Sequence, residues 1–192
     1  MQNGAVVALV SDVGTPAISD PGYKLVRECI NAGIPITGAP GPTSVIAGLV
    51  ISGLPTDQFF FRGFLPTKKA ARRQIIKALR PVPGTLIFME SPRRLAAALN
   101  DLSDILGDRS AAVGRELTKL YEEVRRGTIT ELRDHYGAAP PPKGEVLVMV
   151  GPGKSGEMLT LADLEPEIIG RLRSESARDI ARDLASESGI SR

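Results

Sequence analysis

Two loops rich in proline, glycine and hydroxyl side chains are the segments best suited to bind a small molecule. The first, SDVGTPAISDPG at residues 11–22, follows the apolar run AVVALV at residues 5–10. Such a run is typical of a strand buried on both faces, and ligands in open α/β sheets bind beyond the carboxyl ends of the strands. Gly14 permits close approach of the backbone, and Pro16 fixes its path. The alternative is a plain turn.

This loop lacks the lysine of a Walker motif and the glycine spacing of GxGxxG, so a nucleoside without a polyphosphate fits it better than a nucleotide. The second loop, GAPGPTS at residues 38–44, follows a predicted strand at residues 34–37. Thr43 or Ser44 stands at the N-cap of a predicted helix, where a side-chain oxygen satisfies backbone amides. A stiff cap explains this loop by itself. Because both loops should lie at one sheet edge, the second is a candidate wall of the same site.

A helix predicted over residues 68–80 carries six cations and no acidic residue. Four of them recur at intervals of three and four residues and therefore share one face. This charge predicts contact with nucleic-acid phosphates, with a solvated face as the alternative. The Phe cluster at residues 59–64 is predicted to be core rather than a base-stacking surface. The six cations are Lys68, Lys69, Arg72, Arg73, Lys77 and Arg80.

Further charged residues follow two predicted strands. Glu90, Arg115, Glu116 and Lys119 are expected at one sheet edge, for proton transfer or as a salt-bridged scaffold. The only cysteine and the only histidine, Cys29 and His135, cannot form an internal disulfide or a Cys/His metal site, so no metal is predicted.

The overall composition is that of an ordinary globular protein. The chain has 192 residues, 42% apolar and 24% charged, with a net charge of +2. No apolar run approaches the roughly 20 residues of a membrane span, and no export signal is evident at the start. We therefore expect a cytoplasmic protein without a membrane segment.

The predicted elements form two tandem α/β layers and a charged tail, with the first layer incomplete. Strands at 5–10 and 34–37 alternate with helices at 21–30 and 43–52, a pattern typical of a parallel sheet. The second layer contains predicted helices at 68–80, 92–106 and 130–136 and strands at 85–90, 111–113 and 145–150. The tail contains predicted helices at 161–173 and 176–186, ending as half of a helix-turn-helix or as a frayed helix. The expected domains are 1–57, 58–152 and 153–192.

Four blocks of the sequence, at residues 11–23, 39–66, 85–95 and 115–132, together resemble the rRNA-methylating branch of the tetrapyrrole methylase superfamily. The first block reads SDVGTPAISDPGY and the last RELTKLYEEVRRGTITEL. The resemblance implies two α/β domains with S-adenosylmethionine (SAM) held in the cleft between them, and a homodimer. It also implies methylation of the 2′-hydroxyl of a cytidine ribose in small-subunit rRNA, with the rRNA or the ribosomal subunit as partner.

The resemblance further implies which residues form the site. Thr15 replaces the aspartate of the Gly-Asp-Pro motif of the tetrapyrrole enzymes. Independently of the resemblance, the chemistry of methyl transfer to a hydroxyl suggests Glu116 or Glu90 as the base, with Asp12 also in reach if the loops converge, and Lys119 or Arg115 as electrostatic support. The charge of the basic helix makes it the expected rRNA contact. The residues assigned to the cofactor are Asp12, Gly14, Thr15, Pro16, Ser19, Thr43, Ser44, Met89, Glu90, Arg115, Leu117 and Thr118.

The family carries a further strand and a Gly-Asn loop before the segment that matches residue 5, and a longer helical appendage at its end. We therefore expect this chain to be a fragment of a longer enzyme, inactive by itself. Two rival functions remain. One is SAM-dependent methylation of a tetrapyrrole or of a protein side chain. The other is a noncatalytic RNA-binding module.

Overall fold

The computed structural model describes residues 4–12, 14–153, 168–172 and 175–188. The chain forms two compact units, Met1–Pro152 and Gly153–Arg192. In the second unit, α7 (Ala177–Ser188) stands where the sequence predicts a helix at 176–186, and it packs Ile180 and Leu184 against Ile168. The helix predicted at 161–173 lies mostly outside the described residues. The domain boundary expected near residue 57 stays a prediction.

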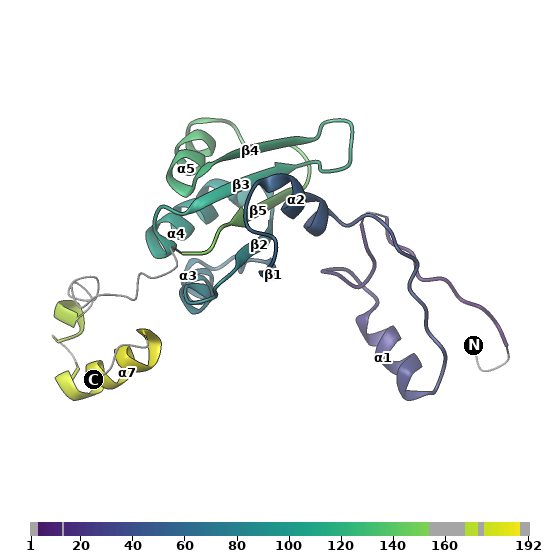
Figure 1. Cartoon of the computed structure of the whole chain (residues 1–192), viewed down its shortest axis with the longest axis horizontal. Coiled ribbons are helices and arrows are strands. Elements are labelled where there is room, and N and C mark those ends of the chain that lie inside the picture. Colours follow the sequence, from purple (N-terminus) through teal and green to yellow (C-terminus); the bar gives the residue numbers. More distant parts are fainter. Residues whose placement is uncertain (1–3, 13, 154–167, 173–174, 189–192) are drawn as a thin grey trace. The chain divides into compact units, whose positions relative to one another are not determined.

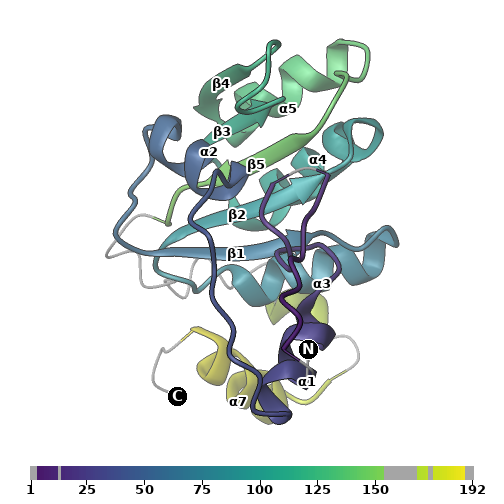
Figure 2. The ribbon, with the colours of Figure 1, turned by 90° about the vertical axis from the view of Figure 1, so that its right-hand side faces the viewer.

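The first unit contains a five-stranded mixed sheet (Figures 1 and 2). Its spatial order is β1 (Phe59–Phe64), β2 (Thr85–Glu90), β5 (Val146–Val150), β3 (Ser110–Arg115) and β4 (Glu123–Thr128). The β1–β2 pair is parallel, and the other neighbours are antiparallel. The α/β class is therefore confirmed, and the sheet is mixed.

Helices cover both faces of this sheet (Figure 2). On one face lie α3 (Lys69–Leu79), α4 (Leu95–Leu106) and α5 (Ile129–Ala138), with a short 3₁₀ turn at Pro92–Arg94 before α4. On the other face lies α2 (Ser44–Ser52). This division separates the buried side chains into two clusters.

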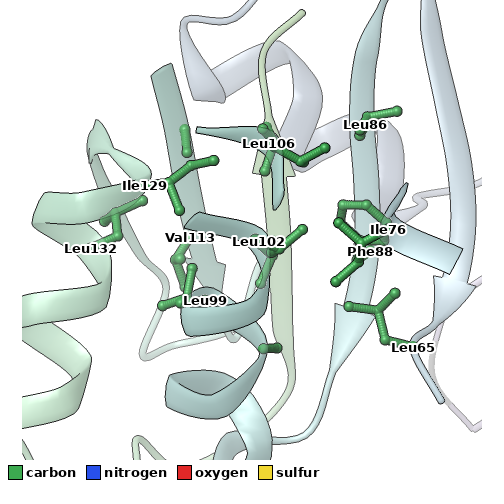
Figure 3. Close-up of a cluster of buried hydrophobic side chains, with 14 of the residues drawn as sticks. Leu65, Ile76, Leu86, Phe88, Leu99, Leu102, Leu106, Val113, Ile129 and Leu132 are labelled. Carbon is green, nitrogen blue, oxygen red and sulfur yellow. The ribbon is translucent and has the colours of Figure 1, made fainter. Parts of the chain in front are cut away.

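Strand alternation assigns each side chain to one of the two clusters. Val146 and Val148 of β5 contribute to the cluster under α3, α4 and α5, whereas Leu147 and Met149 contribute to the cluster under α2. Figure 3 shows the larger cluster, in which Phe88 of β2 lies among leucines and isoleucines. Each such fully buried side chain contributes about 1.5–3 kcal/mol, so these layers fix the positions of the strand ends.

The strands predicted at 5–10 and 34–37 are wrong. These residues have no strand assignment, and Val6 is 98% exposed. A strand requires a neighbour to pair its N–H and C=O groups, and none of the described strands pairs with either segment. The helix between them is present as α1 (Tyr23–Asn31). The apolar residues of these two segments therefore led to the strand prediction, although apolar residues alone do not show which strand would pair with them.

Both edge strands of the sheet were missed from the sequence. The Phe cluster forms β1, where Phe59, Phe60 and Phe64 are 41–50% exposed, so its prediction as core is wrong for these three residues. Phe61 packs against the buried cluster under α2. The charged segment EVRRGT forms β4 at the opposite edge. An edge strand has a neighbour on one side only and tolerates charge and exposure. Neither segment therefore shows the apolar pattern of a central strand.

Candidate functional site

A pocket lies where the two proline- and glycine-rich loops meet the end of β2. The hydroxyl of Thr15 donates a hydrogen bond to the carbonyl of Pro42 at 3.2 Å, which ties the loops together. Met89 of β2 and the loop between β3 and β4 complete the wall. The lining residues are Gly14, Thr15, Ile18, Pro42, Thr43, Ser44, Val45, Met89, Leu117, Thr118 and Glu145. The two loops therefore contact each other, although neither follows a strand in the structure.

Helix α2 brings its first turn to this pocket. Thr43 is its N-cap and has an extended backbone, but the Thr43 side chain makes no capping hydrogen bond, contrary to expectation. The first amides of a helix have no partner within it and carry its partial positive charge. An anionic or polar group of a ligand is therefore favoured at this end.

A glycine lets α2 lie close against the sheet. A Cβ atom on Gly48 would come within 2.5 Å of Leu147 Cδ2 and 3.0 Å of Leu117 Cδ1. Val45 and Leu49 are buried on either side of it along the helix. The close approach fixes the height of the helix above the sheet, and with it the position of the pocket wall.

The loop from residue 116 to residue 122 is held by hydrogen bonds. The carboxylate of Glu116 accepts from the backbone N–H of Glu145 at 2.9 Å and from Lys119 at 3.2 Å. The Glu122 carboxylate accepts from the N–H of Thr118 at 2.7 Å. These bonds present Leu117 and Thr118 to the pocket in one conformation.

Backbone strain gathers in the segments that border the pocket. Among the described residues, positive φ angles at residues other than glycine occur at Ala17, Ser19, Glu116 and Thr118. Each such residue costs of the order of 1–3 kcal/mol, and strain of this kind concentrates at ligand-binding sites. Its occurrence in both walls of one pocket is an independent sign of a site.

Charge at the rim is organised around Lys119. Its ammonium group lies 3.2 Å from Glu116 and 3.1 Å from Glu145. Hydrogen bonds to Glu145 and Glu116 raise the pKa of Lys119, which keeps it charged. The hydrogen bond from the Glu145 backbone, together with Lys119, lowers the pKa of Glu116. A lowered pKa weakens Glu116 as a base at neutral pH.

Seven of the twelve residues assigned to the cofactor line the pocket, and five do not. The seven are Gly14, Thr15, Thr43, Ser44, Met89, Leu117 and Thr118. Asp12, Pro16, Ser19, Glu90 and Arg115 are not among the lining residues, nor are the predicted catalytic residues Glu116 and Lys119. Arg115 pairs instead with Glu123 at 3.1 Å. The pocket therefore brings together seven of the predicted residues, and their role in cofactor binding stays a prediction.

Glu90 faces away from the pocket. It follows Met89 in β2, and successive strand residues point to opposite faces of a sheet. Its side chain is fully buried, with Oε1 accepting from Arg94 at 2.6 Å and from the Ser91 N–H at 2.6 Å. Burial raises the pKa of Glu90 despite these partners. Glu90 therefore lies on the face of β2 opposite the pocket, and it is not part of the pocket wall.

The basic helix, α3, has fewer exposed cations than the sequence suggested. Arg72 is buried and pairs with Asp101 at 2.6 Å, so its predicted contact with RNA is wrong. Arg73 binds Asp101 at 2.7 Å and Asp104 at 2.8 Å. Both arginines hold α3 against α4. The exposed cations of this helix and its flanks are Lys68, Lys69, Lys77 and Arg80.

Sequence reasoning missed four lining residues, namely Ile18, Pro42, Val45 and Glu145. Ile18 and Pro42 lie inside the two loops that it selected. Glu145 follows the proline-rich link and lies next to Lys119 only because β5 pairs with β3. Glu145 is the one acidic residue among the lining residues, and no sequence signal distinguishes it from other surface glutamates.

The pocket lining combines polar and apolar groups. Hydroxyls of Thr15, Thr43 and Ser44 and the first amides of α2 supply polar contacts, while Met89 and Leu117 supply apolar ones. Pockets for cofactors combine such an apolar wall with a few placed polar groups. Within the described ranges, no cluster of His, Cys, Asp or Glu could hold a metal ion, and no helix is long and apolar enough to span a membrane.

Comparison with known proteins relates this chain to one family. The sequence pattern described as Tetrapyrrole (Corrin/Porphyrin) Methylases matches residues 1–133. A protein of Mesorhizobium japonicum named Ribosomal RNA small subunit methyltransferase I is 51% identical over 97% of this chain and 62% of its own length. A protein of the same name from Thermotoga maritima is 42% identical over 78% of this chain and 67% of its own length. The chain spans about three fifths of the length of the Mesorhizobium relative.

Solved structures share the fold at low identity. The methyltransferase CobJ aligns with a TM-score of 0.53 and 17% identity, covering 72% of this chain and 62% of its own. Cobalt precorrin-4 methyltransferase, CbiF, aligns with a TM-score of 0.52 and 18% identity, covering 72% and 61% of the two chains. These alignments support the tetrapyrrole methylase fold.

Proposed function

Because the chain belongs to the tetrapyrrole methylase family, we propose that it is part of a SAM-dependent methyltransferase acting on small-subunit rRNA. The observation that carries this proposal is the contact of the two loops with Met89 around one pocket. The names of its relatives support the rRNA substrate. We further propose the ribose 2′-hydroxyl of a cytidine as the methylated group, in a cytoplasmic homodimer.

The chain's own residues suit the binding of SAM. Gly14 and Thr15 offer backbone and hydroxyl contacts from one side, Thr43 and Ser44 from the other, and Met89 supplies an apolar surface. When bound there, SAM supplies a methyl group on a positively charged sulfur, ready for in-line displacement. The protein mainly aligns the reacting atoms and excludes water.

A ribose hydroxyl is a weak nucleophile, so a group that accepts its proton accelerates its attack. Glu145 is the acidic residue among those that line the pocket, and its carboxylate lies 3.1 Å from the Lys119 ammonium group. We assign it the role of proton acceptor, with the charged Lys119 stabilising the negative charge that develops on oxygen. Glu116, with its lowered pKa, holds the loop.

Gly14 provides a direct test of the cofactor contact. Gly14 has a φ of 75° and lines the pocket. Gly33 has a similar φ of 67° and is not among the lining residues. A Cβ atom at either position meets nothing within 4 Å. We expect Gly14→Val to weaken binding of S-adenosylhomocysteine by about 10-fold or more, because a left-handed valine is strained and occupies ligand space. Isothermal titration calorimetry measures this effect.

Gly33→Val is the matched control, since it carries the same backbone strain outside the pocket. We expect it to bind S-adenosylhomocysteine as the wild type does. Equal affinity of the Gly14→Val and wild-type proteins would exclude Gly14 from the cofactor site.

The exposed cations of α3 separate rRNA from the rival substrates. We expect joint replacement of Lys69, Lys77 and Arg80 by glutamine to weaken rRNA binding. The slope of log affinity against log salt should fall by about 2, at roughly 0.7 for each contact with single-stranded RNA. Filter binding across a salt series measures it, and methyl transfer to small-subunit rRNA should fall in parallel.

Lys24→Gln with Arg27→Gln, two exposed cations of α1, serves as control. An unchanged salt slope in the α3 variant would favour a tetrapyrrole or a protein side chain as substrate. RNA binding without any affinity for S-adenosylhomocysteine would favour the noncatalytic module.

A further inference from the structure

Helix α2, whose first turn forms part of the pocket wall, is also held by a hydrogen bond near its C-terminal end. The Nε of Arg126, in β4, donates to the carbonyl of Ile51 at 3.1 Å, and the Nη2 of the same guanidinium donates to the same oxygen. The two residues are 75 positions apart in the chain. We infer that Arg126 is a positioning residue for the cofactor pocket, which acts by holding the C-terminal end of α2.

The register of the sheet directs Arg126 toward α2. Arg126 pairs with Ala112, which lies in the buried cluster under α2, and directly paired residues share a face. Arg125 pairs with Val113, which belongs to the cluster under α3, α4 and α5. The adjacent residues Arg125 and Arg126 therefore lie on opposite faces of the sheet. Of these two arginines, only Arg126 is on the face that α2 covers.

No residue of α2 itself places a positive charge at its C-terminal end. The last four carbonyls of a helix have no partner within it and carry partial negative charge. The last turn of α2 contains no basic residue. The Ser52 hydroxyl donates to the carbonyl of Leu49 at 2.7 Å, and Gly53 ends the helix in a left-handed conformation. Arg126 supplies the charge that the helix itself lacks, at Ile51.

Movement at one end of α2 is transmitted to the other. The helix has nine residues, so its ends are about 13 Å apart, and a tilt at Ile51 displaces Thr43 and Ser44 in the pocket. Leu49 packs the middle of the helix against the sheet, and Val45 packs its first turn. With the middle attached in this way, the bond to Arg126 fixes the tilt.

This inference rests on the proposed function, and its test has two readouts, one of which needs no cofactor. The variants are Arg126→Ala, Arg126→Lys and the control Arg125→Ala, all in the full-length protein. Hydrogen exchange of the Ala47 amide, which donates to the Thr43 carbonyl at 2.9 Å, reports on the first turn of α2. Calorimetry with S-adenosylhomocysteine reports on the pocket.

For Arg126→Ala, we expect exchange at Ala47 to be about 5-fold faster and the dissociation constant of S-adenosylhomocysteine to be about 3- to 10-fold higher. Arg126→Lys should restore part of both values, and Arg125→Ala should change neither. Unchanged exchange and affinity in Arg126→Ala would overturn the inference, and so would a lowered melting temperature with unchanged affinity. A wild-type protein that does not bind S-adenosylhomocysteine contradicts the proposed function instead, and the exchange data then decide the role of Arg126.

Discussion

Asp101→Asn is expected to destabilise the first unit by about 3–5 kcal/mol, because it leaves a buried arginine without its charged partner. The side chains of Arg72 and Asp101 are 7% and 3% exposed, and their charged groups are 2.6 Å apart. The same carboxylate binds Arg73 at 2.7 Å. Desolvation acts to raise the pKa of Asp101, but hydrogen bonds from Arg73 and Arg72 outweigh it and lower that pKa. Urea unfolding measures the change in free energy.

Asp104→Asn is the matched control. Asp104 also pairs with Arg73, at 2.8 Å, but its side chain is 56% exposed, so its loss should cost less than about 1 kcal/mol. Because the folded-state pKa of Asp101 is lowered, its ion pairs stabilise the fold above the unfolded-state pKa and are lost as the pH falls through the folded value. Equal stability of the two variants would contradict a structural role for Arg72 and restore it as a candidate RNA contact.

Glu145→Gln is expected to lower the rate of methyl transfer by about 100-fold, because it removes the proton acceptor assigned to the pocket. The amide keeps the size of the side chain and a hydrogen-bonding oxygen. The affinity for S-adenosylhomocysteine should therefore change little. Single-turnover transfer of labelled methyl groups to small-subunit rRNA by the full-length protein, with saturating SAM, measures the chemical step.

Glu116→Gln and Glu123→Gln are the controls for this variant. Glu116 binds the same lysine from outside the pocket, and Glu123 pairs with Arg115. Both should keep the rate within a few-fold of the wild type. A large loss in Glu116→Gln alone, with a normal rate in Glu145→Gln, would return the role of base to Glu116.

The central strand β5 and the helix α3 were predictable because their patterns are strong. The run EVLVMV gives β5, and the apolar residues Ile76 and Leu79 mark the buried side of α3. Local periodicity determines such elements. The order of the strands was not predictable, because it depends on pairing between distant segments. The two edge strands and the unpaired segments at 5–10 and 34–37 were therefore assigned wrongly.

The site was predictable to the extent that loop chemistry determines it. Glycine, proline and hydroxyl residues identified both loops, and the resemblance joined them to Met89. Strand alternation would have separated Met89 from Glu90, since neighbours in a strand face opposite ways. Helical spacing would likewise have placed Arg72 one turn before Ile76, on the buried side of α3. Glu145 and Arg126 depend on strand register, which no local pattern in this sequence specifies.

The most direct test of the proposed cofactor site is to titrate the full-length wild-type protein with S-adenosylhomocysteine. Calorimetry measures the binding, and chemical shift changes in assigned amide spectra locate it. We expect saturable binding of one ligand per chain, with a dissociation constant in the micromolar range. The largest shifts should fall on Gly14, Thr15, Ser44 and Thr118. The proposed cofactor site would be contradicted by a folded protein that does not bind millimolar ligand, or by chemical shift changes confined to residues outside both loops.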